Sequence, residues 1–153
     1  TGLYHDMWGF PTQDPKIIHG LIHHLVDKIE NNVHQITRYK EYFLEDAACV
    51  LISYGATARS ALHIVKNRRS RGEKLGLLEL QTLWPFPGDM VREKCSNAQY
   101  VVVVEMNMGQ VVQEVKNVVY DPDRVFLVNR VDGEFITPTD IKNMLRLIQG
   151  RGV

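Results

Sequence analysis

The sequence predicts a three-layer α/β/α domain, in which a mostly parallel sheet lies between two layers of helices. Short apolar runs alternate along the chain with amphipathic stretches, which is the element order of parallel α/β sheets. The strongest strand is Tyr100 to Glu105, where four consecutive valines indicate a strand that is covered on both faces. A polar turn ending at Gly109 and a helical pattern from Gln110 follow it, as at the functional edge of many α/β sheets.

The composition limits the class of protein. A length of 153 residues allows one domain with a real core, and a formal charge of zero gives no sign of a nucleic-acid or membrane partner. No apolar run approaches the roughly 20 residues that span a bilayer. The first residues have neither a basic nor an apolar region, so no signal peptide is expected. Two cysteines are too few for a disulfide framework, so we expect a cytoplasmic protein. The first residue, Thr1, fits a segment of a longer chain, although removal of Met also explains it.

Residues 1–15 are expected to be an interdomain linker, and residues 16–153 the folded domain. Glycines and prolines break any regular pattern in the linker. Large apolar side chains within it would pack either on this domain or on a neighbouring one: Tyr4, Met7, Trp8 and Phe10.

The first helix begins at Asp14-Pro15, an N-cap residue followed by proline, and its apolar spacing continues to about Asn31. His19 and His23 lie four residues apart on it, so a metal pair is geometrically possible. No third ligand is evident, and we interpret these histidines as part of a solvated face, with no metal site.

The remaining elements alternate in order. Thr57 is expected to cap the helix that follows the second strand, and Gly72 to end it. The predicted strands are a weak edge strand within 36–43 and clearer strands at 49–54, 75–80, 100–105 and 125–128. The predicted helices start near residues 57, 88, 110 and 137, and a rigid turn covers 82–87.

Right-handed crossovers bring the loops after the parallel strands to one edge of the sheet. This edge carries no G-x-G-x-x-G, no P-loop and no G-x-S-x-G motif. Residues 55–57 precede a helix and could hold an anion, but such turns are more often simple tight connections.

Glu105 and Arg59 are the charged residues of interest at this edge. Glu105 ends a strand and could be a general base, although such a residue more often satisfies loop amides. Arg59 lies in the first turn of its helix, at the unfavourable end of the dipole, which suggests an acidic partner across an interface.

An ordered set of motifs resembles the C-terminal domain of the alpha subunit of 2-oxoacid:ferredoxin oxidoreductases, most closely the 2-oxoglutarate members. The motifs are L-E-D-A at 44–47, Y-G with A-R-S-A at 54–61, G-L-L at 76–78, T-L-W-P-F-P at 82–87, V-E-M-N-M-G-Q at 104–110 and G-E with I-T-P at 133–138. The resemblance implies the fold of the transketolase C-terminal domain, a five-stranded sheet whose first strand is an antiparallel edge strand.

The resemblance also implies an activity for the whole enzyme, the oxidative decarboxylation of a 2-oxoacid to an acyl-CoA with reduction of ferredoxin. Thiamine diphosphate, magnesium and an iron–sulfur cluster are expected in the holoenzyme but not in this segment, which has no matching motif. The implied partners are the N-terminal domain of the same subunit and the beta subunit, with ferredoxin and CoA at the holoenzyme level.

No catalytic, cofactor-binding or metal residue is therefore expected in the chain, which is interpreted as a non-catalytic structural domain. Candidate sheet-edge and interface residues are Arg59, Trp84, Glu105, Met106, Asn107, Gly109 and Gln110. Two alternatives remain: the equivalent domain of another thiamine diphosphate enzyme, such as the beta subunit of a 2-oxoacid dehydrogenase, or a flavodoxin-like module that binds a small ligand.

Overall fold

The computed structural model describes residues 3–150 and divides the chain into two compact units, Thr1–Ile36 and Thr37–Val153. The first unit contains helices α1 (Pro15–Glu30) and α2 (Val33–Ile36). The Asp14 side chain accepts a hydrogen bond from the Lys16 amide at 2.8 Å, so α1 begins as the sequence predicts. In the loop before α1, a single bridge pairs His5 with Pro11.

Helix α1 buries none of its residues, despite its amphipathic pattern. Four apolar side chains remain largely exposed: Ile17, Ile22, Leu25 and Val26. The rings of His19 and His23 lie 4.2 Å apart between centroids on the exposed helix. Among residues 3–150, no helix has both the length and the apolar character needed to cross a membrane.

The second unit is built on a five-stranded sheet with the order β1-β3-β2-β4-β5. Strand β1 pairs antiparallel with β3, and the other neighbouring strands are parallel, which confirms the predicted mixed sheet. The bounds of the strands are β1 Tyr39–Tyr42, β2 Cys49–Tyr54, β3 Leu75–Leu80, β4 Tyr100–Glu105 and β5 Val125–Asn129.

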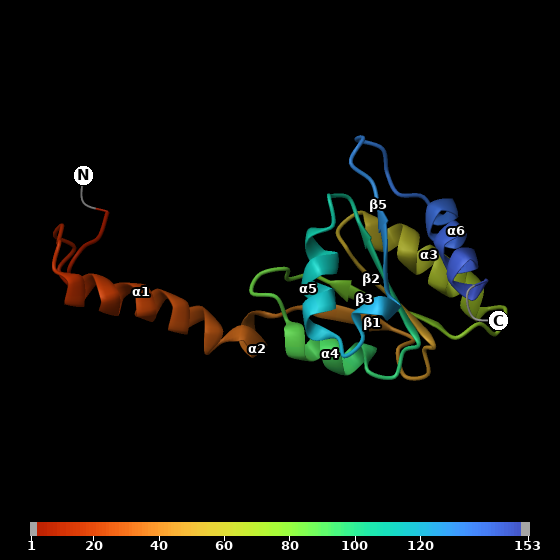
Figure 1. Cartoon of the computed structure of the whole chain (residues 1–153), viewed down its shortest axis with the longest axis horizontal. Coiled ribbons are helices and arrows are strands. Elements are labelled where there is room, and N and C mark those ends of the chain that lie inside the picture. The colour runs from red at the N-terminus through yellow and green to blue at the C-terminus, as the bar shows by residue number, and fades with distance from the viewer. Residues whose placement is uncertain (1–2, 151–153) are drawn as a thin grey trace. The chain divides into compact units, whose positions relative to one another are not determined.

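Helices cover both faces of this sheet, so the unit has three layers (Figure 1). Helices α4 (Gly88–Cys95) and α5 (Gln110–Val118) pack on one face, and α3 (Thr57–Arg69) and α6 (Pro138–Gln149) on the other. The 3-10 turn η1 (Pro122–Arg124) precedes β5. Alternate valines of β4 serve the two cores: Val101 and Val103 lie in the first, and Val102 and Val104 in the second. This explains the unbroken apolar run of β4.

The start of α3 differs from the prediction. Thr57 is not its N-cap but its first helical residue, and no side chain caps this helix. The hydroxyl of Thr57 is turned inward, where it donates to the carbonyl of Tyr54 at 2.7 Å. Ser53 Oγ lies 2.7 Å from the same hydroxyl and donates to the carbonyl of Val104 at 2.9 Å. The sequence pattern suggests a cap, because the threonine follows a glycine turn. In the structure, the Thr57 hydroxyl instead forms hydrogen bonds with Ser53 and with the carbonyl of Tyr54.

Candidate functional site

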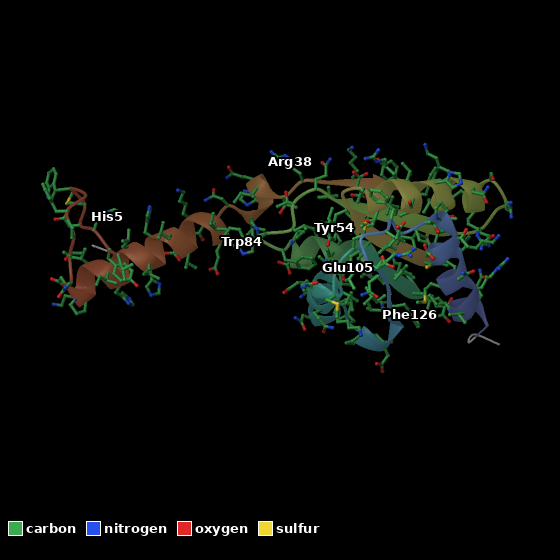
Figure 2. The ribbon with its side chains drawn as sticks, turned by 90° about the horizontal axis from the view of Figure 1, so that it is seen from above. His5, Arg38, Tyr54, Trp84, Glu105 and Phe126 are labelled. Carbon is green, nitrogen blue, oxygen red and sulfur yellow. The ribbon has the colours of Figure 1, made fainter. Side chains whose placement is uncertain are left out.

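The carboxyl ends of the four parallel strands form one edge of the sheet, which we call the carboxyl edge. The loops that follow β2, β3, β4 and β5 meet there, at residues 55–56, 81–87, 106–109 and 130–137. All of the candidate interface residues lie at this edge, on those loops or next to them. Figure 2 shows Tyr54 and Glu105 at the ends of their strands, with Trp84 on the loop after β3.

Glu105 is fully buried at the end of β4, and its carboxylate binds the start of α5. Oε2 accepts from the Val111 amide and Oε1 from the Val112 amide, each at 3.0 Å. Oε2 also accepts from Asn107 Nδ2 at 2.7 Å. A carboxylate at a helix N-terminus is stabilised by the helix dipole and by the free amides of the first turn. The geometry therefore favours the loop-satisfying role over the general-base role.

Asn107 completes the closure of this loop. Its Oδ1 accepts from the Gly109 amide at 2.7 Å and from the Gln110 amide at 3.2 Å. Gly109 has a φ of 96°, a left-handed conformation that favours glycine. Four successive amides, from Gly109 to Val112, are thus bonded to Asn107 or Glu105. An anion would have to displace a side chain of this chain to reach them.

Tyr54 links the end of β2 to this loop. Asn107 Nδ2 donates to the Tyr54 hydroxyl at 2.6 Å. Burial raises the pKa of Tyr54 above its ordinary value, and the nearby Glu105 carboxylate adds to the shift. The phenol therefore stays protonated at neutral pH and serves as a polar contact between two loops.

The candidate interface residues fall into an exposed group and a buried group. Arg59, Trp84, Met106 and Gln110 face solvent, whereas Glu105 and Gly109 are buried and Asn107 is half-buried. Among the described residues, Arg59 has no salt-bridge partner, and it lies in the first turn of the uncapped helix α3. The buried group shapes the loop after β4, and the exposed group is available for contact.

The described residues do not fit the cofactors of the implied holoenzyme. No cluster of three or more His, Cys, Asp or Glu within residues 3–150 could hold a metal ion. The amides that could cradle a diphosphate at α5 are already bonded. An iron–sulfur cluster is held by four cysteine thiolates in its common forms, and the sequence has two cysteines, Cys49 and Cys95.

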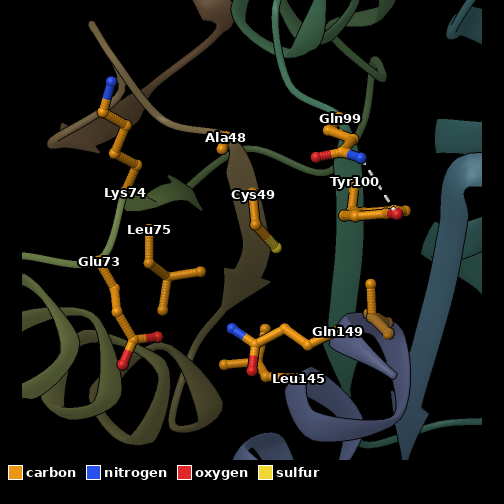
Figure 3. A pocket seen from close by; sticks show the side chains of 10 residues that line it. Ala48, Cys49, Glu73, Lys74, Leu75, Gln99, Tyr100, Leu145 and Gln149 are labelled. Atoms are coloured by element: carbon orange, nitrogen blue, oxygen red, sulfur yellow. Dashed lines mark hydrogen bonds between the residues drawn. The ribbon is translucent and has the colours of Figure 1, made fainter. Parts of the chain in front are cut away.

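A cavity of about 300 Å³ lies at the other end of the strands, between the first residues of β2, β3 and β4 and the end of α6 (Figure 3). Two of its polar side chains are bonded within the chain. Gln99 Nε2 donates to the Tyr100 hydroxyl at 3.2 Å, and the Glu73 carboxylate accepts from Arg68 at 2.6 and 2.9 Å. Cys49 lines the cavity as a protonated thiol, so the cavity offers no activated nucleophile.

Sequence reasoning missed the roles of Tyr54, Ser53 and Thr57 in this edge. It also missed Val131 and Phe135, two exposed apolar residues on the loop after β5. One usable signal was the order Asn-x-Gly after a strand, because an asparagine side chain often accepts from the amide two residues on. The hydrogen bond between Tyr54 and Asn107 joins residues 53 positions apart, which no local pattern reveals.

These features define a class of fold, the three-layer α/β domain with one antiparallel edge strand, and two solved structures share it. The 2-oxoglutarate:ferredoxin oxidoreductase from Magnetococcus marinus, solved with 2-oxoglutarate, coenzyme A and succinyl-CoA bound, superposes with a TM-score of 0.81 at 23% identity. The match covers 96% of this chain and 26% of that one. A split gene transketolase superposes with a TM-score of 0.61 at 20% identity, over 72% of this chain and 40% of that one.

The chain belongs to the family of core domain II of pyruvate:ferredoxin oxidoreductase, whose family model matches residues 47–141. The 2-oxoglutarate synthase subunit KorA of Methanothermobacter thermautotrophicus is 39% identical over 95% of this chain, and the match covers 39% of that relative. The ketoisovalerate oxidoreductase subunit VorB of Methanothermobacter marburgensis is 41% identical over 74% of this chain and 32% of its own length. The chain thus spans about two fifths of the KorA relative's length.

Proposed function

We propose that the chain is a non-catalytic structural and assembly domain of the alpha subunit of a 2-oxoglutarate:ferredoxin oxidoreductase. The whole enzyme would oxidatively decarboxylate 2-oxoglutarate to its acyl-CoA and pass the electrons to ferredoxin. The names of the KorA relatives support the substrate. The observation that carries the non-catalytic role is the closed loop after β4, where Glu105 and Asn107 bind the first amides of α5.

The oxidative decarboxylation would take place in other parts of the enzyme. Thiamine diphosphate, magnesium and an iron–sulfur cluster would be bound by the N-terminal domain of the same subunit and by the beta subunit. Residues 1–15 would be the linker from that N-terminal domain, and residues 16–153 the domain that the linker joins to it. Ferredoxin and CoA would meet the holoenzyme, which would work in the cytoplasm.

A second candidate substrate is a branched 2-oxoacid, because the ketoisovalerate relative is 41% identical over the part that it matches. Family membership favours both oxidoreductase functions over the 2-oxoacid dehydrogenase domain and the flavodoxin-like module.

The first test is an assay of the whole enzyme and of the isolated chain. CoA-dependent reduction of ferredoxin or a viologen dye is measured with 2-oxoglutarate and with ketoisovalerate. We expect turnover with 2-oxoglutarate by the whole enzyme and none by the isolated chain. Turnover by the isolated chain would contradict the structural role, and faster turnover with ketoisovalerate would move the substrate to the branched class.

The second test asks whether Glu105 takes part in catalysis. Loss of a general base lowers kcat by about 10² to 10⁴. We expect Glu105→Gln to leave kcat per assembled enzyme close to that of the parent, because the carboxylate binds only groups of its own loop. A fall of that size in fully assembled enzyme would establish a catalytic role.

A further inference from the structure

The carboxyl edge carries exposed apolar side chains on three loops. Trp84 follows β3 and is 73% exposed, Met108 follows β4 and is 74% exposed, and Phe135 follows β5 and is 67% exposed. Strands β2 and β4 lie between β3 and β5, so the set crosses roughly 14 Å of sheet edge at about 4.8 Å per strand. We call these six residues the apolar rim: Leu83, Trp84, Met106, Met108, Val131 and Phe135.

Hydrogen bonds hold the starts of the loops that carry the apolar rim. Asn129 Nδ2, at the end of β5, donates to the Asn107 carbonyl at 2.9 Å, and Asn107 in turn reaches Tyr54 at the end of β2. At the other side, the Gln81 and Thr82 amides both donate to the Arg38 carbonyl, at 2.9 and 3.0 Å. A preformed apolar surface loses little conformational entropy when a partner covers it.

The charges at this edge specify the partner further. Arg130 is held by both carboxylate oxygens of Asp132, at 2.8 and 2.9 Å, so its charge is matched within the loop. Arg59 has no acidic partner among the described residues, and the positive end of the α3 dipole adds to its field. An acidic side chain on the partner would be attracted both by the Arg59 guanidinium and by the positive end of the α3 dipole.

We propose that the apolar rim and Arg59 form a docking surface for the N-terminal domain of the same subunit. That domain covers the rim with apolar side chains and places a carboxylate against Arg59. This inference rests on the proposed function, since the chain spans 39% of the KorA relative and the rest of that length supplies further domains. Exposed apolar sets of this kind mark protein interfaces, and aromatic residues and arginine are enriched in their energetic centres.

Hydroxyl-radical footprinting of the wild-type whole enzyme tests the surface without any mutation. Labelling rates at Trp84, Met108 and Phe135 are compared with those in free peptides of the same sequence, which corrects for intrinsic reactivity. Tyr120, which is 79% exposed and precedes β5 at the opposite edge of the sheet, is the internal control. We expect the rim residues to label several-fold more slowly than in the peptides, whereas Tyr120 labels at the peptide rate. Peptide-like rates at Trp84 and Met108 would overturn the proposal.

The carboxylate partner is tested by cross-linking. In whole enzyme that carries Arg59→Lys, a carbodiimide joins the introduced amine to a carboxylate in direct contact, and mass spectrometry identifies the joined peptides. We expect a cross-link to an Asp or Glu of the N-terminal domain, and none to that same residue from the control Arg146→Lys, since Arg146 is exposed near the end of α6. A cross-link only to the beta subunit, within this domain, to a second copy of it, or to nothing would overturn the proposal.

The docking surface and the proposed function can be rejected independently of each other. The same wild-type preparation is assayed with 2-oxoglutarate and CoA before footprinting. An active enzyme with an unprotected rim would reject the docking surface alone. An assembled enzyme that has a protected rim but no activity toward any 2-oxoacid would reject the proposed function alone.

Discussion

The hydrogen bonds of the Glu105 carboxylate determine the role of this residue at the carboxyl edge. Glu105 lies where many α/β enzymes place a catalytic acid, yet its two oxygens accept three hydrogen bonds from its own chain. A buried carboxylate needs such partners, because an unpaired charge in the core is strongly unfavourable. The acidic residue and the turn that follows it are therefore one structural unit.

Substitution of this carboxylate should lower the stability of the domain. Glu105→Gln keeps the shape but replaces one acceptor oxygen by an amide nitrogen that faces backbone N–H donors. Hydrogen bonds to charged groups contribute about 1.5–3 kcal/mol, so we expect a loss of about 2–3 kcal/mol in the free energy of unfolding, measured in urea. The control Glu114→Gln, exposed on α5, should stay within about 0.5 kcal/mol of the parent. Equal midpoints for the two variants would contradict this account.

At this scale the sequence predicts residue types better than their partners. It offers two readings of Glu105, and the loop-satisfying one agrees with the contacts. It marks Asn107 as an interface residue, whereas the structure shows its side chain bonded inward to Glu105, Tyr54 and two amides. The partner Tyr54 lies on a different strand, and only the sheet order β2-β4 brings the two together.

Helix ends give the next level of detail, and the start of α6 is the best defined. Thr137 and Asp140 form a capping box: the Thr137 amide donates to Asp140 Oδ2 at 2.7 Å, and the Asp140 amide donates to Thr137 Oγ1 at 3.4 Å. Hydrogen bonds from the Thr137 amide and hydroxyl hold the pKa of Asp140 below its ordinary value. A carboxyl whose pKa is lowered on folding stabilises the fold above its unfolded pKa.

This box predicts part of the acid sensitivity of the domain. The contribution of Asp140 is present at neutral pH and is lost as the pH falls below about 3.9 through the lowered pKa of the folded state. Asp140→Asn should therefore lower the unfolding midpoint at neutral pH and leave it almost unchanged at the acid end. Thermal unfolding of parent and variant across this range measures the difference. A difference that stays constant with pH would show that the charge of Asp140 plays no part.

Element boundaries follow from local chemistry where that chemistry is not used elsewhere. The starts of α1 and α6 are predicted from Asp14-Pro15 and Thr137-Pro138, and both side chains accept the expected amide hydrogen bonds. The start of α3 is predicted less well, because Thr57 is recruited to a buried pair with Ser53. Such recruitment depends on tertiary packing and has no signal in the local sequence.

On the scale of the whole chain, alternation of strands and helices predicts the layers, and the family resemblance adds the antiparallel edge strand. No local sequence pattern predicts the order of the strands in the sheet. Strand β4 lies in the interior of the sheet between β2 and β5, and helices cover both of its faces, as its unbroken apolar run predicts. The amphipathic pattern of α1 predicts a buried face, yet the described chain leaves that face exposed.

The sheet domain should fold without the first unit. The residues of both hydrophobic cores lie within the second unit, Thr37–Val153. A chain of residues 37–153 should therefore unfold cooperatively at the same urea midpoint as residues 1–153. Circular dichroism should show that the longer chain has additional helical signal that disappears before this transition, since an isolated helix of 16 residues is marginal in water. A lower midpoint for the shorter chain would contradict this prediction, because it would mean that residues 1–36 stabilise the sheet domain.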